Sequence, residues 1–181
     1  VDLAYIPKDR FYLYRSQWNK KDETLHVLPH WNWEGREGET TPVFVYTSYP
    51  CAELFVNGVS QGKRTFAEPE GQTPCLGEKA MKRFRLMWDE VTYQPGELKV
   101  VAYDAEGQPV DEKTIHTAGK AAAIKLTPDR KSIKADGEDL CFINVSLTDK
   151  YGNPVPCDSR LVKVKVSGAG SFKAIANGDP T

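Results

Sequence analysis

The stretch Glu53-Leu54-Phe55-Val56-Asn57-Gly58 predicts a short strand followed by a two-residue turn. Asn-Gly favours a β-hairpin because both central residues of its tight turn take positive φ. Runs of alternating apolar residues lie on both sides of this stretch, at residues 43–47 and at residues 98–102. Such alternation has the period of a β-strand. The stretch therefore predicts an antiparallel sheet in the middle of the chain.

Further short strand patterns surround this hairpin. Two of them are residues 25–28 and 110–117, and in a third Phe84, Leu86 and Trp88 face the same way. Strands at intervals of about 8–12 residues are typical of an antiparallel sandwich. Between them, residues 68–79 are rich in glycine, proline and charge, which predicts an exposed loop.

A second block of strand patterns begins near Lys120. Residues 122–126 predict a strand, and residues 141–148 alternate, so we expect them to have one buried and one solvated face. Residues 162–166 and 171–176 predict further strands. The block thus has four or five strands, whereas an immunoglobulin-like sandwich has roughly seven in about 100 residues.

These patterns predict an all-β fold of two immunoglobulin-like antiparallel β-sandwich domains in tandem. We expect the first at residues 21–119 and the second at residues 120–181, with the second cut short. Missing strands would leave a sheet edge unpaired.

Ahead of the strands, residues 1–20 contain a predicted helix with an aromatic side. Pro7 suits the first helical turn, where its missing N–H costs nothing, and Asp9 lies near the positive end of the helix dipole. Its apolar residues recur at helical spacing: Phe11, Tyr14 and Trp18, with Tyr12 and Leu13 widening the surface. A short helix of this kind is not stable alone. We therefore expect it to pack against a partner.

The charge balance excludes several classes of protein. Lys and Arg number 24 and Asp and Glu number 25, for a net charge of -1. A nucleic-acid binder depends on excess cations that meet phosphates, so we expect no nucleic-acid partner. We expect no membrane partner either, since no stretch approaches the roughly 18 apolar residues of a spanning helix.

The sequence predicts neither a metal site nor a bound cofactor, because it also lacks a phosphate loop and a dinucleotide fingerprint. None of the cysteines has C-x-x-C spacing and the three histidines lie far apart, whereas structural zinc needs four close ligands. The four cysteines allow three disulfide pairings, which the sequence does not distinguish: Cys51, Cys75, Cys141 and Cys157. Thiols buried as small apolar side chains are the favoured interpretation, and a disulfide within either half is the alternative.

The most distinctive candidate for binding is the run His30-Trp31-Asn32-Trp33. In an extended segment Trp31 and Trp33 would point to the same side. Two indoles with His30 and Asn32 beside them could form a platform for a sugar ring and its hydroxyls. The alternative is that both indoles pack into the core or against a neighbouring domain.

Acidic residues are plentiful but do not form a recognisable catalytic pair. A glycosidase needs two carboxyl groups that face one bond. The acids of residues 34–39 lie among glycines and predict a solvated loop, and Asp89-Glu90 predicts a turn. We assign no catalytic residue.

Three stretches resemble family-2 glycoside hydrolases of the bacterial β-galactosidase type. They are residues 7–18 (PKDRFYLYRSQW), residues 25–33 (LHVLPHWNW) and residues 52–63 (AELFVNGVSQGK). Residues 120–181 resemble a bacterial immunoglobulin-like module of the invasin type, best at residues 147–155 (LTDKYGNPV). The resemblance covers nearly the whole chain.

The resemblance implies a non-catalytic, C-terminal accessory region of a hydrolase. It makes the predicted helix the closing helix of a catalytic (β/α)8 barrel, so that barrel would be a partner in the same parent chain. The parent would hydrolyse β-galactosides with retention through a covalent intermediate. The family's acid/base Glu follows an Asn, and no Asn-Glu pair occurs here.

Other expectations concern the chain by itself. The alternative function is a stand-alone carbohydrate-binding or adhesive module that uses Trp31 and Trp33. An exposed aromatic helix and an incomplete sandwich would promote self-association. Family resemblance favours a periplasmic or extracellular location.

Overall fold

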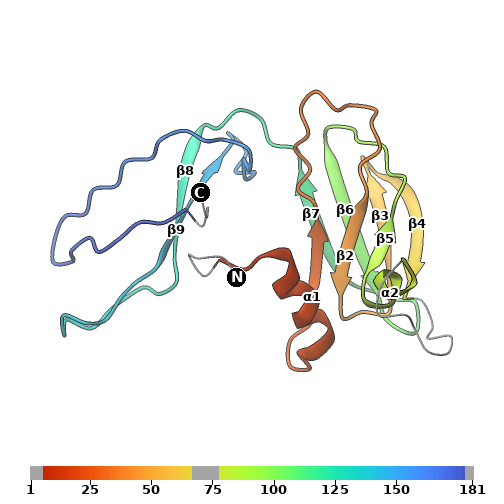
Figure 1. The fold of residues 1–181 in the computed structure, drawn as a ribbon, viewed down its shortest axis with the longest axis horizontal. Helices are drawn as coiled ribbons and strands as arrows, with labels where there is room; N and C mark the ends of the chain where they lie inside the picture. Colours follow the sequence, from red (N-terminus) through yellow and green to blue (C-terminus); the bar gives the residue numbers. More distant parts are fainter. Residues whose placement is uncertain (1–5, 67–77, 178–181) are drawn as a thin grey trace.

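The structure is a computed structural model that describes residues 6–66 and 78–177. Figure 1 shows a sandwich joined by one linker to a much thinner module. The elements in chain order are α1 (Asp9–Trp18), β1 (Leu25–Leu28), β2 (Val43–Thr47), β3 (Cys51–Val56), β4 (Val59–Thr65), α2 (Glu78–Phe84), β5 (Leu86–Trp88), β6 (Glu97–Tyr103), β7 (Pro109–His116), β8 (Ala123–Pro128) and β9 (Ile143–Thr148).

Two antiparallel sheets form the first module. One has the strand order β1-β2-β5 and the other the order β4-β3-β6-β7. The predicted hairpin is confirmed, since β3 pairs with β4 across Asn57 and Gly58, whose φ values are 48° and 80°. The predicted helix before the strands is confirmed as α1. The all-β class predicted from the sequence therefore holds for this module.

Alternation places one side of each central strand in the core. Val43 and Val45 of β2, Leu54 of β3 and Leu98 and Val100 of β6 have no exposed surface. Leu54 lies opposite Val100 in the pairing of β3 with β6. Residues of both sheets belong to one buried cluster, so the core lies between the sheets.

The Asn57 side chain joins the hairpin turn to the start of β6. Its Oδ1 accepts a hydrogen bond from the Glu97 N–H at 2.7 Å, and its Nδ2 donates to the Pro95 carbonyl at 3.2 Å. Gly96 has a φ of 134°, and a Cβ there would lie 2.0 Å from the Asn57 Oδ1. Only glycine therefore fits between Pro95 and Glu97 without displacing this side chain.

The segment before β5 differs from the prediction. Residues 78–84 form helix α2 where the sequence predicted the end of a loop and the start of a strand, and Phe84 belongs to α2 rather than β5. Ala, Met, Lys, Arg and Glu are strong helix formers, and the basic residues of its last turn favour a helix C-terminus. Residues 67–77 of the expected loop lie outside the described residues.

The second module has fewer strands than predicted. Strands β8 and β9 pair with each other, and no strand occurs in the described part of residues 162–177. The predicted buried face is also absent, because Ile124, Leu126 and Val145 are exposed. A two-stranded sheet has no second sheet to bury its apolar side. The described part of this module, residues 120–177, therefore forms no second sandwich.

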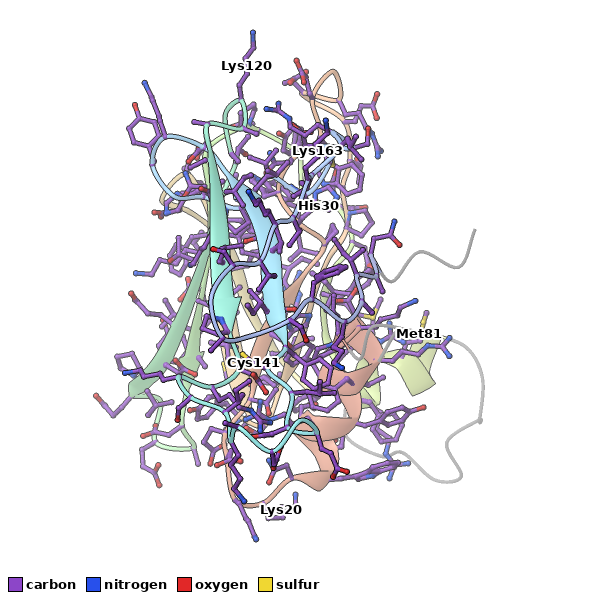
Figure 2. The ribbon with its side chains drawn as sticks, turned by 90° about the vertical axis from the view of Figure 1, so that its left-hand side faces the viewer. Lys20, His30, Met81, Lys120, Cys141 and Lys163 are labelled. Carbon is purple, nitrogen blue, oxygen red and sulfur yellow. The ribbon has the colours of Figure 1, made fainter. Side chains whose placement is uncertain are left out.

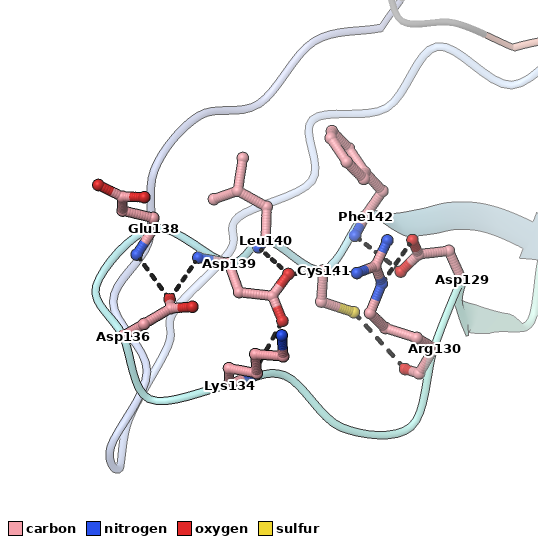
Figure 3. A network of polar contacts seen from close by, with 9 residues as sticks. All are labelled: Asp129, Arg130, Lys134, Asp136, Glu138, Asp139, Leu140, Cys141 and Phe142. Atoms are coloured by element: carbon pink, nitrogen blue, oxygen red, sulfur yellow. Dashed lines mark hydrogen bonds and ion pairs between the residues drawn. The ribbon is translucent and has the colours of Figure 1, made fainter.

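Polar contacts hold the long loop between β8 and β9. Arg130 lies between two carboxylates, 3.0 Å from Asp129 and 3.2 Å from Asp139, as Figure 3 shows. The Asp139 carboxylate also accepts the backbone N–H of Lys134 at 2.8 Å. The Cys141 thiol lies 3.7 Å from the Arg130 carbonyl. The loop thus takes its shape from side chain to backbone hydrogen bonds.

Replacing Leu54 by Ala tests the placement of the core. We expect the free energy of unfolding to fall by about 2–5 kcal/mol, because a fully buried leucine leaves a cavity. Urea denaturation of the chain measures this loss. Val59→Ala, at an exposed position at the start of β4, is the control and should cost less than about 0.5 kcal/mol. Equal losses in the two variants would contradict the described core.

Candidate functional site

Trp31 lies in the core, not on a binding platform. It has no exposed surface, and its ring meets that of Tyr93 edge to face with centroids 5.0 Å apart. Its Nε1–H donates to the Gln94 carbonyl at 2.9 Å. The segment is not a strand, so the period of two that would align Trp31 with Trp33 does not apply. Trp31 therefore cannot form an exposed platform with Trp33, and the alternative that the indole packs into the core holds for Trp31.

Trp33 remains half-buried at the edge of the same core. The His30 ring stacks on it with centroids 4.4 Å apart, and the Arg36 guanidinium lies 5.2 Å from its centre. Its Nε1–H is buried without an acceptor among the described residues. Burial lowers the pKa of His30, which favours a neutral ring beside Trp33. Sugar binding by His30, Asn32 and Trp33 stays a prediction, with one indole instead of two.

Asn32 holds the linker between the modules. Its Nδ2 donates to the Ala118 carbonyl and its Oδ1 accepts from the Ala118 N–H, both at 3.2 Å. The adjacent Thr117 hydroxyl donates to the Trp31 carbonyl at 2.5 Å and accepts from the Gly96 N–H at 3.1 Å. The run predicted as a sugar site thus fixes where the chain leaves β7.

Asp149 continues this junction from the second module. Its Oδ2 accepts the Gly119 N–H at 3.0 Å and the Asn153 Nδ2–H at 3.1 Å. Its Oδ1 accepts the N–H groups of Tyr151 and Asn153, both at 2.9 Å. Burial alone would raise the pKa of Asp149, but these hydrogen bonds lower it to about 2. Asp149 therefore binds its own turn and the linker as an anion.

The cysteines correct one expectation. None of the three described cysteines is in a disulfide, and Cys75 lies outside the described residues. Cys51 and Cys141 are only partly buried, and Cys157 is exposed with its thiol 3.9 Å from His30 Nε2. The favoured interpretation of buried thiols is therefore wrong for these three.

Helix α1 is attached by one side and exposed on the other. Tyr12 stacks on His26 of β1 with ring centroids 3.9 Å apart, and Asp9 lies 2.8 Å from His26 Nε2. The opposite side, which we call the aromatic face, consists of Phe11, Tyr14 and Trp18, exposed by 40%, 50% and 75%. Figure 2 shows α1 in red on the same side of the sandwich as the labelled Met81 of α2. An exposed cluster of this kind marks an interaction surface.

The described ranges contain neither a metal-binding cluster nor a membrane-spanning helix. Across residues 6–66 and 78–177, no group of three or more acidic, histidine or cysteine side chains is placed to hold a metal ion. No helix in these ranges combines the length and the apolar character needed to cross a membrane.

Comparison with known families identifies the two modules. Residues 124–181 match the model of the glycoside hydrolase family 2 C-terminal domain 5. Residues 38–111 match a domain of unknown function, DUF4982. The chain thus matches the C-terminal region of glycoside hydrolase family 2 proteins. The resemblance to family-2 glycoside hydrolases is thereby confirmed, while the resemblance of residues 120–181 to an invasin-type module stays a prediction.

Relatives from Bacteroides ovatus and Formosa agariphila match nearly the whole length of this chain. A beta-galactosidase of Bacteroides ovatus, BoGH2A, is 41% identical over 99% of this chain and 19% of its own length. A putative beta-glucuronidase of Formosa agariphila is 28% identical over 99% of this chain and 16% of its own length. The chain therefore spans about a fifth of the length of these relatives.

The fold recurs in solved structures of family-2 enzymes. A beta-glycosidase from Bacteroides vulgatus matches with a TM-score of 0.72 and 34% identity, over 86% of this chain and 18% of that one. A family-2 member from Bacteroides cellulosilyticus matches with a TM-score of 0.67 and 33% identity, over 85% of this chain and 21% of that one. The described fold is that of the corresponding part of these proteins.

The Asp149 network predicts a stability that depends on acidity. Because the pKa is lower in the folded chain than the ordinary 3.8, the stabilisation is complete above about pH 4 and is lost as the pH falls through about 2. Asp149→Asn lacks this titration. We expect urea denaturation to show a stability difference between the natural chain and the variant at pH 5 that shrinks towards pH 2. An equal difference at both pH values would contradict the role given to the carboxylate.

Proposed function

We propose that this chain is a non-catalytic accessory region of a longer family-2 glycoside hydrolase, and that it contacts the catalytic region through α1. The observation that carries the proposal is the aromatic face, which is exposed while the rest of the first module has a closed core. Burial of these exposed aromatic side chains against a partner favours association, because apolar surface is removed from water. The length of the relatives, about five times that of this chain, supports a large neighbour in the same protein.

The junction supports an architectural role for the chain. Asn32, Thr117 and Asp149 fix the linker through both side chains and backbone. A region held in this way transmits a fixed orientation from one module to the next. The accessory role therefore includes placing the second module relative to the surface that α1 contacts.

We propose β-galactoside hydrolysis with retention as the parent's reaction. The beta-galactosidase of Bacteroides ovatus, at 41% identity, supports the substrate class, while the Formosa relative named as a putative beta-glucuronidase marks the competing one. In a retaining enzyme two carboxyl groups about 5–5.5 Å apart form and then hydrolyse a covalent glycosyl-enzyme. We place both groups in the catalytic region, outside this chain.

The chain by itself should not hydrolyse glycosides. The measurement is release of nitrophenol from nitrophenyl β-galactoside and from nitrophenyl β-glucuronide, with the full-length enzyme as the positive control. The expected rate for the purified chain equals that of buffer with both substrates. Turnover that follows the chain through further purification would overturn the non-catalytic assignment.

Contact through α1 is tested by oxidative footprinting of the full-length enzyme and of the isolated chain. We expect hydroxyl radicals to label Tyr14 and Trp18 at least about fivefold more slowly in the enzyme, because a covered ring is shielded from solvent. Trp88, which is buried in the chain, should be labelled slowly in both and serves as the control. Equal labelling of Trp18 in the two samples would refute the contact.

A further inference from the structure

Arg85 is a cation without an acidic partner among the described residues. It lies between the end of α2 at Phe84 and the start of β5 at Leu86. Its Cζ is 5.7 Å from the centre of the Phe44 ring and 5.8 Å from that of Tyr46. Its Nε–H is buried and meets no acceptor in the part of the chain that the structure describes.

A guanidinium in this state is suited to bind an anion. The two rings hold the planar group by cation–π attraction, so little side-chain freedom is lost when an acid binds. A buried donor without an acceptor retains the full cost of desolvation. A carboxylate can accept two parallel N–H bonds from one guanidinium. Arg85 therefore fits a carboxylate in charge and in shape.

Arg85 lies beside the helix that carries the aromatic face. The Gln17 side chain of α1 donates to the carbonyl of Phe84, the residue before Arg85, at 3.4 Å. Tyr46 lies within reach of the charges of both Arg85 and Arg10 of α1. Arg85 therefore lies next to α1, the helix that carries the aromatic face.

Basic residues lie in both helices next to Arg85. Arg10 and Arg15 belong to α1, where Arg15 lies 4.0 Å from Asp22, and the last turn of α2 is also basic. The only acid within α1 is Asp9, which is held by His26 at 2.8 Å. The chain as a whole has a net charge of -1, so this basic character is local. A complementary partner surface is apolar with acidic residues at its rim.

We propose that the surface covering the aromatic face carries a carboxylate that binds Arg85. This inference rests on the proposed function, because the partner it describes is the catalytic region of the same enzyme. The contact combines apolar burial against Phe11, Tyr14 and Trp18 with one bidentate ion pair. The ion pair fixes the register of a contact that the apolar face alone would leave free to slide.

Charge reversal in the full-length enzyme tests the ion pair. Arg85→Glu should raise the labelling rate of Trp18 by about fivefold, to the rate of the isolated chain, because it places two carboxylates next to each other in a covered site. Arg85→Lys keeps the charge without the planar fork and should have an intermediate effect. Lys113→Glu, on exposed β7 of the other sheet, is the matched control and should leave the labelling unchanged. Urea denaturation of each isolated variant chain shows whether the fold survives, and Arg85→Lys decides the question if Arg85→Glu does not fold.

The outcomes separate this inference from the proposed function. If Trp18 is protected in the natural enzyme and exposed by Arg85→Glu but not by Lys113→Glu, the ion pair is supported. If Trp18 is protected in the natural enzyme and stays protected in both Arg85 variants, the carboxylate partner is refuted while the docking contact stands. If Trp18 is unprotected in the natural enzyme, the docking contact fails and the ion pair fails with it.

Discussion

The burial of Trp31 is the constraint on which the arrangement of both modules depends. Its indole fills the core beside Tyr93, and its Nε1–H is satisfied by the Gln94 carbonyl. Because the side chain is fixed, the backbone around it is fixed as well, and its carbonyl accepts the Thr117 hydroxyl. The Asn32 side chain then donates a hydrogen bond to the Ala118 carbonyl and accepts one from the Ala118 N–H. One buried ring thus sets the course of the linker that leads into the second module.

The sequence predicted the first module well because its signals are local and periodic. Alternation at Val43, Val45 and Leu98 and the Asn57-Gly58 turn together define strands, faces and a hairpin. The sugar platform failed for the opposite reason. Its geometry assumed a strand at residues 29–33, but tertiary contacts to residues more than 60 positions away decide where Trp31 points. The network around Asp149 had a signal, an Asp before a Gly-Asn turn, but its link to Gly119 depends on the fold.

The two modules also show why strand patterns alone do not guarantee strands. In the first module each central strand has neighbours on both sides, so its backbone groups are paired and its apolar side chains face another sheet. In the second module the same alternation at residues 162–166 meets no neighbouring strand among the described residues. A stable sheet needs both hydrogen bonds to neighbouring strands and an apolar face that is buried against another layer. Self-association through these exposed apolar residues stays a prediction from the sequence.

The surface around α1 combines apolar contacts, which supply attraction, with a charged hydrogen-bond donor, which supplies direction. Apolar rings supply attraction that has little directional preference, since it scales with the area removed from water. The Arg85 guanidinium, which lies over the rings of Phe44 and Tyr46, supplies direction, because its donors point along fixed lines. A net charge of -1 conceals this local arrangement, which is visible only when the helices and the sheet are placed together. Strength and register in such a contact therefore come from different residues, and each can be changed without the other.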